Sequence, residues 1–151
     1  MTMNKRSQLM DLLTNIINYV EVIQEEYIRV HLKSELSSSE IHVIEAIELE
    51  NESTMSNVAR RLMVTTGTLT TSTNKIIQKG YIEKKQSHLD KRVTLLVLTD
   101  KGHLAFDIHK KFHEKMEEVI VKEVSSEEYS YFFGIVRNIY SSLITQNWDE
   151  I

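Results

Sequence analysis

The chain has 151 residues, of which 41% are hydrophobic and 26% are charged, and its formal net charge is −4. This composition is typical of a globular protein, and no apolar run approaches the roughly 20 residues that would cross a bilayer. There is no cysteine, which excludes disulfides, thiolate metal sites and cysteine nucleophiles. Residues 1–11 mix charge and polarity unlike a secretory signal, so we expect a protein of the bacterial cytoplasm.

Apolar residues recur every three or four positions within residues 4–33, which predicts one long amphipathic helix. A second such stripe lies within residues 125–147 and predicts a last helix that begins at Ser125 or Ser126. The part of the chain between them is too small to cover both stripes. We therefore expect these two helices to form a homodimer; packing onto the chain's own middle part is the alternative.

The middle of the chain follows the order of a winged helix-turn-helix, a mainly α fold with a small antiparallel β-hairpin as its wing. Ser37 with Glu40 predicts a capped helix before it, and Thr99 is the expected cap of the helix after it. The predicted elements between these two are a helix over Thr54–Leu62, the turn Met63–Thr65, a second helix over Thr66–Lys79 that stops at Gly80, and strands Tyr81–Ser87 and Val93–Leu98 around the turn His88–Arg92.

Charge is distributed unevenly. Residues 54–101 hold nine Lys or Arg against three Asp or Glu, a balance of +6 within a chain of net charge −4. A basic region in an acidic protein is expected where a surface meets phosphates. We therefore predict that residues 54–101 form the DNA-binding module of a single domain that spans residues 1–151.

The helix over Thr66–Lys79 has a polar face that suits a DNA major groove, because its side chains are small and mostly uncharged. Threonine methyl groups can contact thymine methyl groups, and Asn can form paired hydrogen bonds to adenine, so we expect an operator rich in A·T pairs. The predicted DNA contacts of this helix are Thr66, Gly67, Thr68, Thr70, Thr71, Asn74 and Lys75.

The turn between the two strands adds Asp90, Lys91 and Arg92 to the predicted DNA-binding residues. Arg92 is placed to reach the minor groove and Lys91 to reach a phosphate. Asp90 cannot contact DNA favourably, so we expect it to hold the Arg92 guanidinium through a charge-assisted pair.

The motifs Asp90-x-Arg92 and Leu98-Thr99-x-x-Gly102, within this helical frame, resemble the MarR family of bacterial regulators along essentially the whole chain. The resemblance implies homodimers that bind pseudo-palindromic operators. Residues 62–72, 79–83 and 109–113 are more narrowly similar to the family members that repress fatty-acid biosynthesis. This implies repression of type II fatty-acid synthesis genes, with long-chain acyl-acyl carrier protein as co-repressor.

An acidic carrier protein needs a basic landing site, and an acyl chain needs an apolar pocket. The candidates for docking of the carrier protein are Lys101, His109, Lys110, Lys111 and Lys115, and those for the acyl pocket are Ile23, Tyr27, Ile41, Ile44, Phe106 and Phe112.

A metal-responsive regulator is the alternative. His109 and His113 lie four residues apart and share one helix face, and zinc-responsive members of the family hold the metal between similar helices. The other ligands would be His42 and Glu25 or Glu26. An enzyme is not expected, because the chain has no phosphate-binding glycine loop, nucleophile elbow or His-Glu-x-x-His motif. A purely structural helical protein would leave the basic module unexplained.

Overall fold

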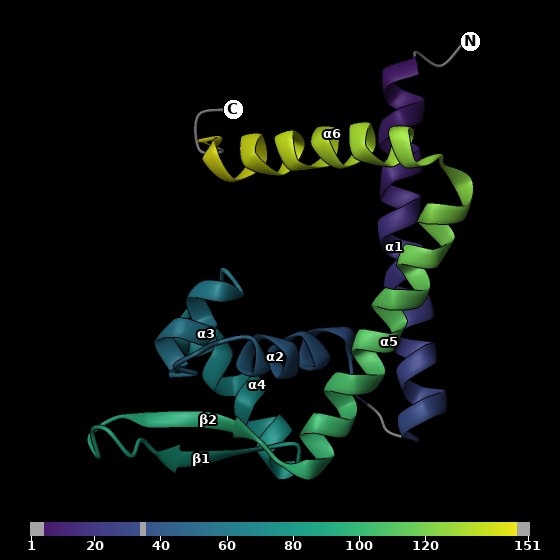
Figure 1. Cartoon of the computed structure of the whole chain (residues 1–151). Helices are drawn as coiled ribbons and strands as arrows, with labels where there is room; N and C mark the ends of the chain where they lie inside the picture. The colour runs from purple at the N-terminus through teal and green to yellow at the C-terminus, as the bar shows by residue number, and fades with distance from the viewer. Residues whose placement is uncertain (1–4, 34–35, 148–151) are drawn as a thin grey trace. The chain divides into compact units, whose positions relative to one another are not determined.

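The computed structural model describes residues 5–33 and 36–147, which form six helices and a two-stranded antiparallel sheet. Figure 1 shows the elements, which in chain order are α1 (Lys5–Leu32), α2 (Ser38–Glu48), α3 (Met55–Arg61), α4 (Thr66–Gln78), β1 (Ile82–Gln86), β2 (Thr94–Leu98), α5 (Asp100–Glu123) and α6 (Ser126–Thr145). The mainly α winged-helix fold is thereby confirmed, with element ends within one or two residues of those predicted.

Local hydrogen bonds explain where the helices begin. Ser37 and Glu40 form a capping box at the start of α2, in which each side chain bonds the other residue's backbone N–H. Ser125 and Glu128 form the same arrangement at α6. Thr99 accepts the N–H of Gly102 at 3.1 Å in the first turn of α5. These caps satisfy backbone donors that a helix end leaves unpaired, which confirms the predicted starts.

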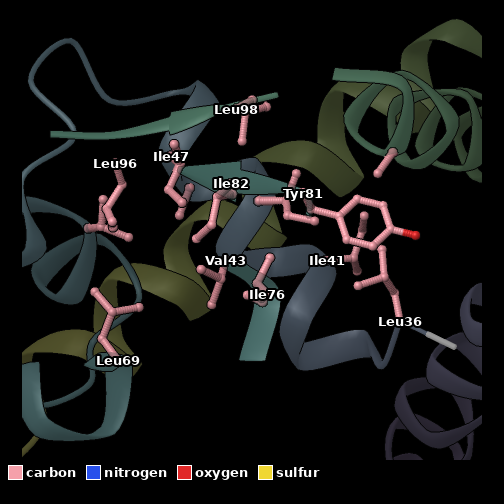
Figure 2. Close-up of a cluster of buried hydrophobic side chains, with 14 of the residues drawn as sticks. Leu36, Ile41, Val43, Ile47, Leu69, Ile76, Tyr81, Ile82, Leu96 and Leu98 are labelled. Carbon is pink, nitrogen blue, oxygen red and sulfur yellow. The ribbon is translucent and has the colours of Figure 1, made fainter. Parts of the chain in front are cut away.

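The chain divides into two compact units, residues 1–112 and residues 113–151, and α5 runs through the boundary between them. The first unit contains the buried hydrophobic core. Figure 2 shows side chains of α2, α4 and the hairpin meeting there, among them Ile41, Ile76, Tyr81 and Leu96. Each of these four is at most 1% exposed, so the core joins α4 and the wing to α2.

The hairpin is held by the hydrogen bonds between its two strands and by a contact with the segment before α3. Its strands pair in the register Ile82 with Leu98 through Gln86 with Thr94. The N–H of Leu96 also donates to the carbonyl of Ser53 at 2.9 Å, so the segment that leads into α3 lies beside β2. The first turn of α5 packs closely against the backbone of Tyr81, since a Cβ on Gly102 would lie 2.1 Å from the carbonyl oxygen of Tyr81.

The long terminal helices have little buried surface. Only Gln24 and Ile28 are buried among the residues of α1, and no residue of α6 is buried. Both helices instead expose large apolar side chains, which in α6 include Phe132, Phe133, Val136, Ile139, Tyr140 and Leu143. In the described part of the chain, no helix combines the length and the apolar character of a membrane span.

Candidate nucleic-acid interface

Short-range hydrogen bonds hold the turn that leads into α4. Met63 adopts a φ of 54°, and the N–H of Val64 donates to the carbonyl of Ala59 at 3.0 Å. Thr65 then caps α4, because its hydroxyl oxygen accepts the N–H of Thr68 at 3.1 Å. The turn is thus a defined structure, and it fixes the direction in which α4 leaves α3.

One face of α4 is buried and the opposite face is open. Leu69, Thr73 and Ile76 are the buried residues, and Ile77 packs partly against the core. All the α4 residues that sequence reasoning assigned to DNA contacts are exposed: Thr66, Gly67, Thr68, Thr70, Thr71, Asn74 and Lys75. The structure therefore puts these seven residues where a major groove can reach them, and the contacts themselves remain predictions.

The tip of the wing is ordered by its own backbone and by Asp90. The carbonyl of Asp90 accepts the N–H of Val93 at 2.9 Å, and its carboxylate accepts the N–H of Arg92 at 2.9 Å. The expectation that Asp90 holds the Arg92 guanidinium is therefore wrong for this structure, because the carboxylate bonds the backbone of the turn. Lys91 and Arg92 are both exposed, so the two cations extend from a fixed tip.

The C-terminal end of α4 is tied to α2 by an ion pair that the sequence did not reveal. The ammonium of Lys79, the C-cap of α4, donates to both carboxylate oxygens of Glu40, at 2.8 and 2.7 Å. Burial would raise the pKa of Glu40, but the bonds from Lys79 and Ser37 outweigh it and hold that pKa below its ordinary value. α4 is thus anchored to α2 by a charged pair in which Glu40 is only 7% exposed.

The predicted docking site for a carrier protein is only partly supported. His109 is fully buried, so its assignment to a docking surface is wrong. The ammonium of Lys101 donates to the carbonyl of Lys79 at 2.8 Å and lies 4.1 Å from the ring centre of Tyr81, so it caps α4. Lys110 and Lys111 are exposed in the first unit, and Lys115 is exposed in the second.

The six predicted acyl-pocket residues are divided between the packed core and the surface of α1. Ile41 and Ile44 are fully buried members of the packed core. Tyr27 contacts the ring of Phe112, with 5.7 Å between centroids, and Phe106 packs partly against the core. Ile23 and Tyr27 instead border an open, largely apolar hollow of about 420 Å³ on α1, whose full lining is Tyr19, Val22, Ile23, Glu26, Tyr27, Val30 and His31.

The histidines meet around a buried amide, a feature that sequence reasoning missed. The Gln24 side chain lies 3.4 Å from Nε2 of His42 through its nitrogen and 3.3 Å from Nε2 of His109 through its oxygen. The Glu45 carboxylate lies 3.8 Å from Nδ1 of His109. His113, the other predicted histidine ligand, belongs to the second unit.

The carboxylates that were expected to complete a metal site have other partners. Glu25 accepts the backbone N–H of Ser38 at 2.9 Å, and Glu26 forms an ion pair with Arg29. Their assignment as ligands is therefore wrong for this structure. Glu45 was overlooked although its spacing, three residues after His42, places both on one side of a helix.

Comparison with known proteins agrees with this geometry. Residues 39–119 match the family model described as a winged helix DNA-binding domain. The chain is 27% identical over 112 residues to the HTH-type transcriptional regulator PchR of Bacillus subtilis (strain 168), a match that covers 72% of this chain and 66% of PchR. Three other curated relatives are matched over about half of their length, for example BilQ of Clostridium symbiosum (strain WAL-14163), which is 32% identical over 45% of this chain and 47% of BilQ.

Solved structures give a fuller match. FabT of Streptococcus pneumoniae, solved in complex with DNA, is 39% identical, with a TM-score of 0.84 over 93% of this chain and 98% of FabT. A MarR/EmrR family regulator from Acinetobacter sp. ADP1 shares the fold at 15% identity, with a TM-score of 0.74 over 95% of this chain and 100% of that one. This chain thus belongs to the MarR family of winged helix DNA-binding transcriptional regulators, and it is a regulator and not an enzyme.

Proposed function

We propose that the protein is a repressor of type II fatty-acid biosynthesis genes, that it acts as a homodimer in the bacterial cytoplasm, and that long-chain acyl-acyl carrier protein is its co-repressor. The observation that carries the proposal is the 39% identity to FabT over nearly the whole of both chains. The operator would be pseudo-palindromic and rich in A·T pairs, with half-sites roughly one helical turn apart.

Three features of the DNA-binding module and its attachment to α2 support binding to such an operator. The open face of α4 is small and polar, the wing carries Lys91 and Arg92 on a fixed tip, and Glu40 anchors the end of α4. Preorganised groups bind more tightly because less conformational freedom is lost on association. The module therefore suits sequence reading by α4 together with phosphate and minor-groove contacts by the wing.

The exposed stripes of α1 and α6 support the homodimer. α6 presents large apolar residues such as Phe133, Val136 and Ile139 at helical spacing, and none is buried within the chain. Contiguous exposed apolar faces of this kind mark protein contacts. A second copy of the chain is the proposed occupant, because two copies also provide the two recognition helices that a palindromic operator requires.

The acyl-acyl carrier protein is supported by charge and by the surface of α1. The chain as a whole is acidic, yet Lys110 and Lys111 are both exposed on α5 and offer cationic contacts for an acidic partner. The hollow bordered by Ile23 and Tyr27 is apolar enough to receive part of an acyl chain. The carrier would act by binding the DNA-competent arrangement of the dimer more tightly than other arrangements.

A titration with labelled promoter duplexes tests the proposal. The duplexes come from fatty-acid synthesis promoters, and binding is followed by fluorescence anisotropy with no carrier, with unacylated carrier or with long-chain acylated carrier. We expect promoter binding that acylated carrier strengthens and unacylated carrier does not. The double variant Lys110→Ala/Lys111→Ala should keep basal DNA affinity and lose the response. Equal affinity for unrelated DNA, or equal effects of the two carriers, would contradict the proposal.

A metal-responsive repressor is the second candidate, favoured by the meeting of His42, His109 and Glu45. Two imidazoles and one carboxylate are ligand types that zinc accepts. Nδ1 of His109 faces the Glu45 carboxylate, so this ring could bind zinc through Nδ1 while its Nε2 keeps the contact with Gln24. Zinc would then add charge at a buried junction of α1, α2 and α5.

Calorimetric titration of the chelator-treated protein with zinc distinguishes this candidate from the first. Stoichiometric binding that Glu45→Gln weakens, and that tightens operator binding without any carrier protein, would support it. Operator affinity that is the same with zinc and with chelator would remove it.

A further inference from the structure

The hydroxyl groups on the open face of α4 are bonded to the helix itself. Thr70 Oγ1 donates to the carbonyl of Thr66 at 2.7 Å, and Thr71 Oγ1 donates to the carbonyl of Gly67 at 3.4 Å. Thr68 Oγ1 lies 2.9 Å from the hydroxyl of the cap, Thr65. Three of the threonines predicted to meet DNA therefore have an intramolecular partner for the hydroxyl.

This internal bonding changes what these threonines offer to a base. A hydroxyl has one proton to donate, and in Thr70 and Thr71 that proton is directed at a backbone carbonyl four residues earlier. The part of each side chain that is not bonded to the helix is its methyl group. Thr70 and Thr71 therefore offer a base a methyl group and a hydroxyl oxygen that can only accept, although both residues are classed as polar.

The position of these methyl groups matches the centre of the reading face. At 3.6 residues per turn, Gly67, Thr71 and Asn74 lie on one line along the helix, opposite the buried Leu69 and Ile76, and Thr70 lies beside that line. Gly67 has no side chain, and apart from its chain neighbours and the helix backbone, the nearest described atom to an added Cβ would be Thr65 Oγ1 at 3.8 Å. A groove floor can therefore approach the backbone of α4 next to the threonine methyl groups.

We propose that α4 recognises thymine through the methyl groups of Thr70 and Thr71, with their hydroxyls serving the helix and not the base. The ligand is the 5-methyl group that thymine presents in the major groove, the one apolar group among the base edges there. The inference rests on the proposed operator binding and adds to it the atoms that carry the discrimination. Asn74 is then the residue that reads a neighbouring adenine by paired hydrogen bonds.

The operator used in the test is selected from random duplexes with the wild-type protein. Each thymine is then replaced singly by deoxyuridine, which removes the methyl group and keeps base pairing. We expect one or two positions per half-site at which deoxyuridine weakens binding about fourfold, the effect of losing one buried methyl group.

Matched substitutions separate the methyl group from the hydroxyl. Thr71→Val keeps a methyl group and removes the hydroxyl, whereas Thr71→Ser does the reverse; the same pair is made at Thr70. Thr, Val and Ser have similar helix propensities, so α4 should be retained in all four variants. We expect the Val variants to bind like the wild type, and the Ser variants to bind more weakly and to become insensitive to deoxyuridine at one position.

Thr145→Ser provides the control, because Thr145 Oγ1 bonds the carbonyl of Ser141 at 2.9 Å in the same way but lies in α6. It should leave binding unchanged.

Loss of affinity in the Val variants with retention in the Ser variants would show hydroxyl readout and overturn the inference. Equal binding of thymine and deoxyuridine operators would overturn it too, while leaving the proposed DNA binding intact. A wild-type protein that selects no duplex at all would overturn both.

Discussion

The DNA-binding module and the C-terminal helix α6 differ in how much of their apolar surface is buried within the chain. In the module, Ile76 and Tyr81 are at most 1% exposed, and Lys79 pairs with Glu40 of α2, 39 residues earlier in the chain. α6 is also rich in apolar residues, yet Ile139 is 52% exposed and no residue of α6 is buried. The same kind of residue is therefore used for folding in one region and, as we propose, for association in the other. Paired substitutions can test this difference.

The largest contrast is expected between two isoleucines. Ile76→Ala removes a fully buried side chain and should lower the free energy of unfolding by about 2–5 kcal/mol. Ile139→Ala should lower it only where the protein is dimeric, because binding of a second copy adds stability that depends on concentration. Urea unfolding at several protein concentrations, with mass from light scattering, measures both. If Ile139→Ala lowered the free energy of unfolding in the dilute monomer as well, the proposed difference between the two isoleucines would be contradicted.

Two helical glycines give the next contrast. A Cβ on Gly102 would collide with the carbonyl of Tyr81, so Gly102→Ala should destabilise the protein by about 1–3 kcal/mol. A Cβ on Gly134 meets nothing within 4 Å, and Gly134 lies on the side of α6 away from the apolar stripe. Gly134→Ala should therefore stabilise the protein by roughly 0.5–1 kcal/mol. Thermal denaturation of both variants checks the signs, and destabilisation by Gly134→Ala would place a contact on that side of α6.

A smaller difference in stability is expected between substitutions in the capping boxes of α2 and α6. Glu40→Gln removes the charge that holds Lys79 and should cost about 1–2 kcal/mol at neutral pH. Because the folded pKa of Glu40 is lowered, this stability is present above the unfolded pKa and is lost as the pH falls through the folded pKa. The difference between the variant and the wild type should therefore shrink in acid.

Glu128→Gln is the matched control for that experiment. The bonds from the backbone and side chain of Ser125 also lower the pKa of Glu128, but this carboxylate is exposed and has no partner from another helix in the capping box. Its variant should change stability less than Glu40→Gln does. Urea unfolding at neutral pH and at several acid pH values follows both variants, and equal losses would mean that the Lys79 pair adds nothing to the cap.

The smallest effect on stability is expected at Arg92, whose predicted contribution is to DNA binding. Arg92→Ala should leave the melting temperature unchanged because the side chain is exposed at the wing tip. It should weaken binding of all operators and reduce the slope of log affinity against log salt by about one. Anisotropy titrations between low and moderate salt give this slope. An unchanged slope would remove Arg92 from the contact surface.

The structural features that depend on neighbouring residues could be predicted from the sequence. The caps at Ser37, Thr99 and Ser125, the two strands of the hairpin and the open face of α4 follow from side-chain periodicity and from hydrogen bonds that span a few residues. Each of these was predicted close to its observed position. The rules involved are local, so folding of the remaining chain does not alter them.

Features that depend on distant residues were missed or wrongly assigned. The partner of Glu40 is 39 residues away, and only the docking of α4 on α2 brings them together. His109 was grouped with Lys110 and Lys111 because they are adjacent in sequence. Its spacing from Ala105, Ile108 and Phe112 indicates the buried side of α5, and this periodicity was the signal that could have corrected the assignment.

The capture of Lys79 by Glu40 has a consequence for how the protein would search a genome. Within α4 only Lys75 remains as an outward cation, so the helix adds little indiscriminate attraction to the duplex. Counterion release by Lys91 and Arg92 would keep the molecule near the double helix while it slides. Wrong sites are then left quickly, and a long residence is reserved for the site whose base edges fit α4.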